Sequence, residues 1–346
     1  MSFEQSRITE KSGDSRTFPC ESCGADLEFN IGVQSLKCPF CGFEKALELS
    51  EDDIVEQDLQ TALTRLQTGH DAATAPTDAE QLNCSSCGAK ILFEGVVTST
   101  ECPYCGTPVQ RGDVHRAEDR VKVDGMLPFM VEKTNAKEKI RHWVRTRWFA
   151  PNEFKRRGVS GQFEGVYLPY FTFDAMTFTV YRGQRGDYYY VEVGSGDNKR
   201  RERRTRWSSA SGRFQRFFDD VLICCARAVE TKLVHALEPW PLPTLKPFDH
   251  QMIAGHKAMT YDIELADAFT MAQEEIDSSL QADVRGRIGG DVQRVSALNT
   301  DYSALTYKHL LLPVYILAYR YKEKSHRVFV NACTGEVQGQ RPWSWV

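Results

Sequence analysis

Two cysteine-rich segments, 64 residues apart, place the strongest constraint on how this chain folds. CESCGADLEFNIGVQSLKCPFCG begins at Cys20, and CSSCGAKILFEGVVTSTECPYCG begins at Cys84. In both, 14 residues separate two CxxC pairs, and a glycine follows the second cysteine of each pair. Two such turns can bring four thiolates to one tetrahedral ion. We therefore predict two metal sites, with Cys20, Cys23, Cys38 and Cys41 in the first and Cys84, Cys87, Cys102 and Cys105 in the second.

We expect the metal to be zinc, with two ions per chain, because tetrathiolate sites of this ribbon type most often hold zinc. A rubredoxin-like iron site is the closest alternative, since a CPxCG turn suits either metal. Disulfides or unligated structural thiols agree poorly with a repeat of four cysteines and two glycines. So short a unit buries too little apolar surface to fold without its ion. Four protein ligands also close the site, which predicts a structural and not a catalytic role.

Composition limits the function classes. The 346 residues include 43 basic and 47 acidic side chains, so contact with nucleic acid or acidic lipid requires a local basic patch. Eleven cysteines without an apolar leader after Met1 indicate metal binding in a reducing compartment, and we expect a cytoplasmic protein. The longest apolar stretch, Leu310–Tyr319, has half the length of a bilayer span and contains a proline. We therefore expect no transmembrane helix.

Composition and patterning divide the chain into six parts. The glycine-, proline- and alanine-containing segment 69–80 is typical of a flexible linker, so we expect ribbons with independent orientations. The predicted parts are a disordered tail (1–17), a first zinc ribbon (18–48), an acidic helix with a linker (49–81), a second zinc ribbon (82–110), a charged connector (111–124) and a duplicated α+β domain (125–346).

The predicted fold class is α+β, with antiparallel sheets after the two ribbons. Apolar periodicity predicts helices after caps at Ser50 and Asn135, and a third from Leu265 that ends before Gly286. Strands are predicted in YLPYFTFDAMTFTVYRG, DYYYVEVG, LPVYILAYRYK and SHRVFVNACTGEV, the last two joined as a hairpin. Two motif pairs suggest the duplication: MLPF (126–129) with LKPF (245–248), and YLPYFTF (167–173) with LLPVYIL (311–317).

No catalytic residue can be named from the sequence. Phosphate-binding loops with GxxxxGK[ST], HExxH, GxSxG and kinase motifs are absent. GRIGGD after the third helix suits a helix cap and turn. Cys224 and Cys225 lie in the apolar run VLICCARAV and are predicted to be inert core thiols. We expect a protein without enzymatic activity; an active site that local motifs do not reveal is the third alternative.

One dense basic run stands out in an acidic chain. This run, residues 199–207, can bind phosphate or an anionic surface, and the indole of Trp207 can stack on a ligand or anchor the run. Alternatively, it is a solvated hairpin whose arginines pair with acids elsewhere. Its residues are Lys199, Arg200, Arg201, Arg203, Arg204, Arg206 and Trp207.

The order of motifs resembles a family of bacterial tandem zinc-ribbon proteins. The resemblance rests on both cysteine cassettes, FEGVYLPYFTFDA, RTRW at Arg204–Trp207 and the closing LLPVYILAYRYK…VFVNACTGEVQGQRPWSW, and so covers nearly the whole chain. Members are labelled primosomal-protein-N′-like helicases or transcription-factor-IIB-type zinc-ribbon proteins. They are similar to adaptors found with phage-shock and band-7 membrane scaffolds. Many continue into transmembrane helices where this sequence ends at Val346, so we expect no such anchor, and peripheral membrane association stays open.

These observations favour a non-enzymatic zinc-binding adaptor that presents two ribbons to protein partners, in line with the resemblance to adaptors at membrane-stress assemblies. The alternative is an accessory factor that binds nucleic acid and lacks helicase activity, because the ATP-binding motifs of such an enzyme are missing. The ribbons carry few basic residues and the segment between them is acidic. We therefore expect nucleic-acid binding to be weak, salt-sensitive and dependent on Arg200–Arg206.

Overall fold

The computed structural model describes residues 18–25, 27–31, 33–47, 54–68, 80–83, 90–93, 99–101, 108–110, 114–116, 121–146, 162–194, 198–254, 256–321 and 324–340. Of the described residues, those within 80–116 and 319–325 and residue 250 are described by their backbone alone. The predicted tail 1–17 lies outside these residues.

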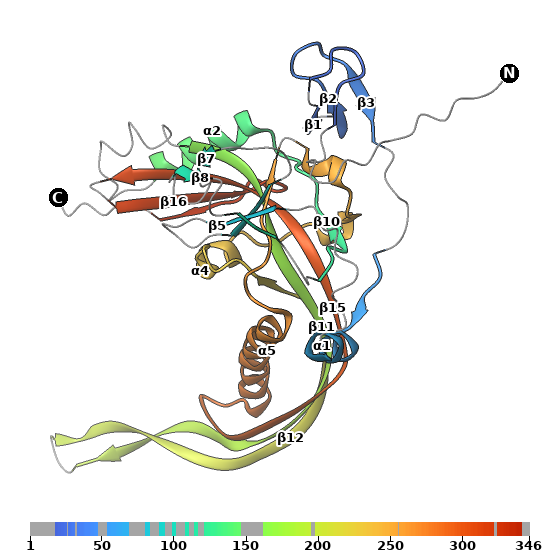
Figure 1. Cartoon of the computed structure of the whole chain (residues 1–346). Helices are drawn as coiled ribbons and strands as arrows, with labels where there is room; N and C mark the ends of the chain where they lie inside the picture. Colours follow the sequence, from blue (N-terminus) through green and yellow to red (C-terminus); the bar gives the residue numbers. More distant parts are fainter. Residues whose placement is uncertain are drawn as a thin grey trace.

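Two long strands run antiparallel through the centre of the molecule (Figure 1). They are β11 (Gln162–Val193) and β15 (Val292–Tyr321), and β12 (Arg200–Cys224) pairs with the other edge of β11. Strands β16 (Lys324–Asn331) and β17 (Val337–Gly339) extend the sheet beyond β15. The predicted antiparallel sheet and the hairpin between 321 and 324 are confirmed.

The strands are longer than their predicted pieces. YLPYFTF and DYYYVEVG belong to one strand, β11, and the first half of β15 was not predicted at all. Around Leu168 both faces of the sheet are covered, so nearly every residue there is buried and the sequence is a continuous apolar run. Beyond Met176 one face is covered and the pattern alternates, with Tyr181 buried and Val180 exposed.

Helix α5 (Leu265–Ile288) covers the three-stranded part of this sheet. Its apolar stripe, Ile276, Leu280 and Val284, packs against Tyr181 and Phe214. The helix continues through Gly286 and ends at Gly289, whose φ of 65° requires the left-handed conformation that glycine favours. The predicted end before Gly286 was wrong, because Ile288 still has a buried position in the stripe.

The other predicted helices begin at different residues. Helix α1 (Leu59–Thr68) begins well after Ser50, because Gln57–Asp58 form strand β4, which pairs with β15. Asp58 caps α1 by accepting the Thr61 N–H at 2.7 Å. Helix α2 (Lys133–Arg145) begins before Asn135. The other helical turns in the described part of the chain are α4 (Thr231–His235), η3 (Leu242–Thr244) and η4 (His250–Ile253).

Three short strands add to the centre of the sheet. Strand β10 (Gly125–Met126) runs parallel to β15 at Leu310–Leu311, and β14 (Lys257–Ala258) runs parallel to β11 at Val166–Tyr167. The motif LKPF, which the sequence matched with MLPF, instead contributes β13 (Lys246–Pro247), which pairs antiparallel with β10. MLPF and LKPF therefore lie side by side in the sheet and are not equivalent positions of a repeat. The strand equivalent to β10 is β14: β10 pairs parallel with β15, and β14 pairs parallel with β11.

The first ribbon is a three-stranded sheet of β1 (Glu28–Asn30), β2 (Ser35–Lys37) and β3 (Glu44–Ala46) that rests on the main body. Phe29 is 5% exposed and shares a buried cluster with Phe129 and Met252. Its N–H donates to the Ala254 carbonyl at 3.1 Å, and the Gln34 amide donates to the Phe129 carbonyl at 3.1 Å. The prediction of an independently oriented bead was wrong for this ribbon, because its own core is too small to bury Phe29.

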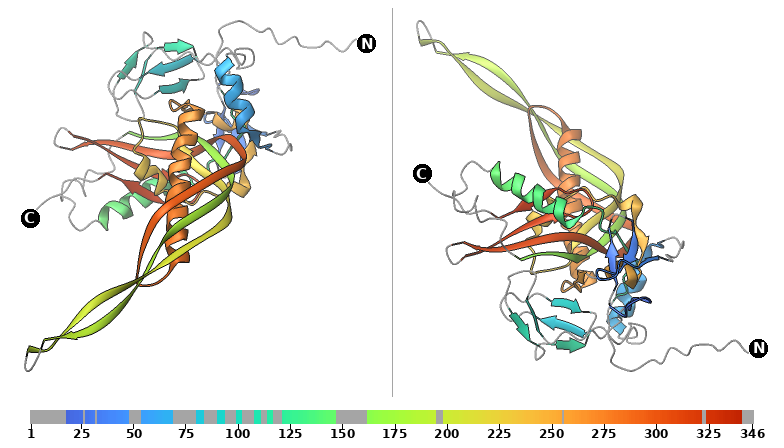
Figure 2. Two further views of the ribbon diagram at one scale, coloured as in Figure 1. Left: turned by 90° about the horizontal axis from the view of Figure 1, so that it is seen from below. Right: turned by 90° about the horizontal axis from the view of Figure 1, so that it is seen from above.

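The described strands between residues 80 and 116 form a second group beside the body (Figure 2). Strands β5 (Glu80–Asn83), β6 (Lys90–Phe93) and β9 (Val114–Arg116) pair with one another, and β7 (Ser99–Glu101) pairs with β8 (Pro108–Gln110). Strand β6 also pairs with β14 through Leu92 and Ala258, which joins this group to the main sheet. Strand β9 lies in the predicted connector. Among the described residues, no helix combines the length and the apolarity that a membrane crossing requires.

Docking of the first ribbon predicts unequal effects for two phenylalanines in it. Phe29→Ala should lower the free energy of unfolding by about 3 kcal/mol, because it removes a buried ring and leaves a cavity. Phe40→Ala, at a ring that is 81% exposed, should change it by less than about 0.5 kcal/mol. Urea unfolding followed by tryptophan fluorescence measures both. Equal midpoints for the two variants would show that the ribbon does not share the core.

Candidate metal centre

Two tight turns of the first ribbon carry the candidate ligands. In the turn that begins at Cys20, the Gly24 N–H donates to the Cys20 carbonyl at 2.8 Å; in the turn that begins at Cys38, the Gly42 N–H donates to the Cys38 carbonyl at 3.1 Å. Gly24 and Gly42 have φ values of 74° and 77°, a backbone conformation that side chains disfavour. This requirement explains the glycine after each CxxC pair.

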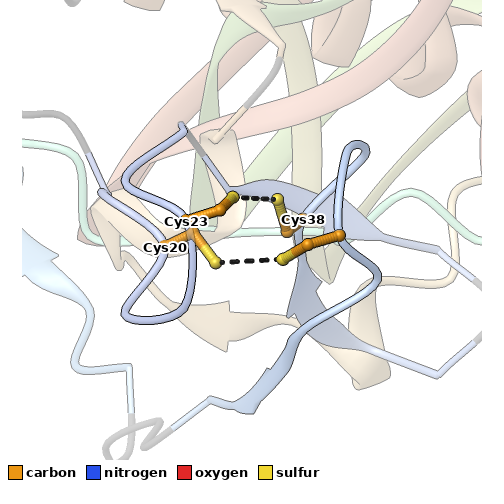
Figure 3. Close-up of side chains that lie close together, drawn as sticks. Cys20, Cys23 and Cys38 are labelled. Carbon is orange, nitrogen blue, oxygen red and sulfur yellow. Dashed lines mark hydrogen bonds between the residues drawn. The ribbon is translucent and has the colours of Figure 1, made fainter.

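The turns bring four sulfur atoms together (Figure 3). The Sγ atoms of Cys20, Cys23, Cys38 and Cys41 all lie within 4.8 Å of one another. Cys20 and Cys41 are 3.5 Å apart, as are Cys23 and Cys38. Metal–sulfur bonds of about 2.3 Å in a tetrahedral site separate the sulfurs by roughly 3.8 Å. The four cysteines therefore fit one metal ion, as predicted for this segment.

The electrostatics of the cluster favour a cation. Cys20 and Cys38 are buried, whereas Cys23 and Cys41 face solvent. A hydrogen bond from the Phe43 N–H lowers the pKa of Cys41 to about 6. A hydrogen bond from the Ala25 N–H lowers the pKa of Cys23. The adjacent thiols of Cys41 and Cys38 together outweigh this effect and raise that pKa to about 12. One thiolate thus disfavours the next, and a divalent cation removes that repulsion.

The ligands predicted for the second site, Cys84, Cys87, Cys102 and Cys105, lie outside the described residues. Two of the described strands in that segment, β7 and β8, repeat the first ribbon. In the β2–β3 hairpin Ser35 pairs with Ala46, and in β7–β8 Ser99 pairs with Gln110, each 64 positions later. Strand β6 corresponds in sequence position to β1, but its pairing differs. Among the described residues β6 pairs with β5 and β14, whereas β1 pairs with β2.

The three described cysteines outside the ribbon are core thiols. Cys224 and Cys225 are buried, as predicted; burial raises the pKa of Cys224 to about 12 and holds that of Cys225 well above its usual value. Burial also raises the pKa of Cys333 to about 12. A thiol that resists ionisation is a poor nucleophile and a poor metal ligand, so these cysteines are structural.

The basic run Lys199–Trp207 lies far from the cysteines, on the hairpin of β11 and β12 (Figure 1). The six basic residues are exposed and Trp207 is half-buried. Within the run, Arg204 lies 3.8 Å from the exposed Glu202. The structure therefore does not combine this run and the metal centre into one site.

An ionic cluster around the buried Lys308 was not predicted from the sequence. Lys308, which is 8% exposed, contacts Asp220 at 2.8 Å and Glu56 at 3.2 Å. Burial opposes a raised pKa for Lys308, but these acids raise it. Asp174 accepts hydrogen bonds from Asp220 N–H at 2.7 Å and Thr306 Oγ1 at 3.0 Å, and burial raises its pKa. The cluster attaches the segment before α1 to an irregular point of the sheet, and its members are too distant in sequence to form a motif.

A cleft of about 470 Å³ adjoins the metal centre. The first ribbon contributes Phe29, Ile31 and Lys37 to its wall, and the start of α2 contributes Glu132 and Lys133. Cys38, Pro39 and Gly42 complete it on the side of the centre. The cleft exists because the ribbon is docked beside α2.

The metal centre predicts a clear stoichiometric effect. Cys38→Ser should remove one equivalent of bound metal per chain, because a hydroxyl does not replace a thiolate in a tetrathiolate site. Cys333→Ser is the matched control: it changes another cysteine and should leave metal content unchanged. Elemental analysis of purified protein measures both. Full metal content in Cys38→Ser would exclude this cysteine as a ligand.

Comparisons with known proteins identify one distant relative of uncharacterized function. The chain is 24% identical over 341 residues to the uncharacterized protein YdjG of Bacillus subtilis (strain 168), and the alignment covers 95% of this chain and 90% of YdjG. No protein-family model matches the chain, and no solved structure matches it.

Proposed function

We propose that this chain is a zinc-binding adaptor without catalytic activity of its own, which acts in the cytoplasm. The observation that carries the proposal is the four-cysteine centre docked on the sheet. Four protein thiolates fill a tetrahedral shell and leave no position for a substrate or an activated water. The zinc at such a centre holds the ribbon in shape, and the ribbon presents its outer surface to partners.

The described residues as a whole favour an adaptor over an enzyme. The four-cysteine cluster is the one group of three or more metal-ligating side chains that they contain. The buried Lys308 contacts Asp220 and Glu56, so its charge is compensated by these acids. These observations support a structural role for the charged groups.

A second zinc ion, held by Cys84, Cys87, Cys102 and Cys105, is part of this proposal. It is supported by the cassette repeat and by the β7–β8 hairpin, which has the register of β2–β3 displaced by 64 positions. In the first ribbon this hairpin positions Cys38 and Cys41, so the same backbone suits Cys102 and Cys105.

We also propose that residues 125–346 arose by duplication. The sites at which β10 joins β15 and β14 joins β11 are 144 positions apart, the same offset that relates LLPVYIL to YLPYFTF. Leu168 pairs with Leu312 at this offset, which places them on a pseudo-twofold axis. Helix α5 contacts the β11–β12 hairpin, and α2 contacts β16 and β17, so each helix covers strands from the other half.

The partner surface is the exposed Cys38–Cys41 turn of the first ribbon. Phe40 is 81% exposed in this turn. Val33, which is 64% exposed, lies beyond the other end of β2, in the turn between β1 and β2. Exposed apolar side chains on a metal-rigidified turn lose little conformational entropy on binding. The adjoining cleft, which Pro39 helps to line, provides a concave surface beside them.

The second site is tested by metal counting. Purified wild-type protein should contain two zinc ions per chain, and Cys102→Ser should contain one, because the second cassette closes its own tetrahedral shell. Elemental analysis gives the zinc and iron contents together. One zinc in the wild type, or stoichiometric iron in protein from its native host, would contradict the assignment.

The adaptor function is tested by capture of partners. Phe40→Asp should abolish retention of at least one protein on the tagged chain, because a carboxylate cannot be desolvated in an apolar contact. Val55→Asp, at a residue that is 67% exposed outside the ribbon, is the control. Quantitative mass spectrometry after nuclease treatment measures retention. Identical protein sets for the wild type and both variants would contradict the adaptor proposal, as would ATP hydrolysis abolished by a point mutation in this chain.

A further inference from the structure

The β11–β12 hairpin continues past the rest of the sheet. Pairing of β11 with β15 ends at Gly186 and Val292, whereas pairing with β12 continues to Val193 and Arg200. We call residues 187–193 and 200–206 the basic arm. Both figures of the whole chain show this two-stranded ribbon projecting away from the body (Figures 1 and 2).

The base of the arm is fixed by specific contacts. Asp291 N–H donates to the Gly186 carbonyl at 2.9 Å, and Asp291 Oδ2 accepts the Tyr188 N–H at 2.6 Å. Asp291, the residue just before β15, therefore hydrogen-bonds to the edge of β11 at the point where its pairing with β15 ends. The Arg294 guanidinium of β15 lies 4.0 Å from the centre of the Trp207 ring of β12, a contact that crosses the intervening strand β11. These contacts set the direction in which the arm leaves the sheet.

Positive charge is concentrated on the arm and its base. Residues 182–207 contain eight basic and four acidic side chains, although the whole chain has a net charge of −4. The rest of the molecule is therefore more acidic than the total suggests. Such segregation attracts a polyanion to the arm and repels it elsewhere.

The arginines occupy both faces of the ribbon. In β12 the alternation of side chains places Arg200, Arg204 and Arg206 on one face and Arg201 and Arg203 on the other. The register with β11 places tyrosines on both faces as well: Tyr189 pairs with Arg204 on the first face, and Tyr190 pairs with Arg203 on the second.

Tyrosine rings hold several of these guanidinium groups. Arg203 lies 4.3 Å from the centre of the Tyr188 ring, Arg201 lies 5.1 Å from that of Tyr190, and Arg206 lies 5.9 Å from that of Tyr189. A guanidinium stacked on a ring keeps its N–H donors at its edge, where they can bind phosphate oxygens. The stacking also restricts rotation of long side chains, which lowers the entropic cost of binding.

We propose that the basic arm binds duplex DNA by entering its major groove. A flat anionic surface meets one face of a ribbon, whereas a groove presents phosphates to both faces. The major groove of B-DNA is about 12 Å wide and admits a two-stranded β-ribbon. Seven residues of strand extend roughly 23 Å, enough to follow the groove over about seven base pairs. This site is separate from the metal centre and does not depend on the adaptor function.

The geometry also discriminates between duplexes. A-form RNA has a deep, narrow major groove that excludes a ribbon of this width. The arm should therefore bind a DNA duplex more tightly than an RNA duplex of the same sequence and length. Contacts are to phosphates, so affinity should depend little on base sequence.

The test uses the full chain and a fluorescently labelled DNA duplex of about 20 base pairs, with anisotropy measured over a salt series. The triple variant Arg200→Glu, Arg201→Glu, Arg203→Glu should bind at least about tenfold more weakly and lose roughly 2.7 from the slope of log K against log salt. The same three positions changed to lysine should retain most of the affinity. Arg141→Glu, Arg145→Glu, Arg213→Glu is the control, since it makes the same charge change at exposed arginines outside the arm.

Several results would overturn the proposal. An equal loss in the control variant would show attraction to overall charge alone. Equal affinity for the RNA duplex would contradict entry into the major groove. Binding to vesicles that contain phosphatidylserine, lost in the arm variant and without DNA binding, would assign the arm to a lipid surface. Phe40→Asp should bind DNA as the wild type does, which separates this site from the adaptor surface.

Discussion

The antiparallel pairing of β11 with β15 positions almost every other part of the described structure. It extends from Gln162 opposite Ala318 to Gly186 opposite Val292, with Leu168 opposite Leu312 about a quarter of the way along. Around Leu168 both faces are buried, so side chains on both sides of the sheet exclude water from the backbone hydrogen bonds. The short strands β10 and β14 attach there, and through them the segments that lead to the helices.

The metal centre depends on this sheet for its position but not for its internal geometry. Its ligands are set by two turns whose hydrogen bonds span four residues each. Its place on the body is set by Phe29, which enters the cluster that covers one face of the long strands. An ion bound by the four cysteines would hold the turns in shape, and the turns hold β1 against the sheet, so we expect metal binding and ribbon docking to be linked.

Charge is distributed according to the layers that cover the sheet. Where β15 lies against the segment before α1, Lys308 is buried and contacts two acids, Glu56 and Asp220. Where β11 and β12 continue without a third strand or a covering helix, arginines and tyrosines face solvent on both sides. Lysine and arginine in the same sheet therefore have different roles, because burial requires paired charges and exposure does not.

Local chemistry made part of this structure predictable. The first metal centre followed from cysteine spacing and from glycines at positive φ, and helix α5 followed from its apolar stripe, since both depend on residues close in sequence. Other features depend on distant partners. Helix α1 begins at Leu59 because β15 recruits Gln57 and Asp58 into the sheet, and Phe29 docks because a cluster built from later residues receives it. The basic run could be recognised in the sequence, but its exposure on two faces could not. It arises because β12 pairs with β11 past the end of β15. The first residue of β15 lies over 80 residues after the basic run, so only three-dimensional packing sets where this third strand ends.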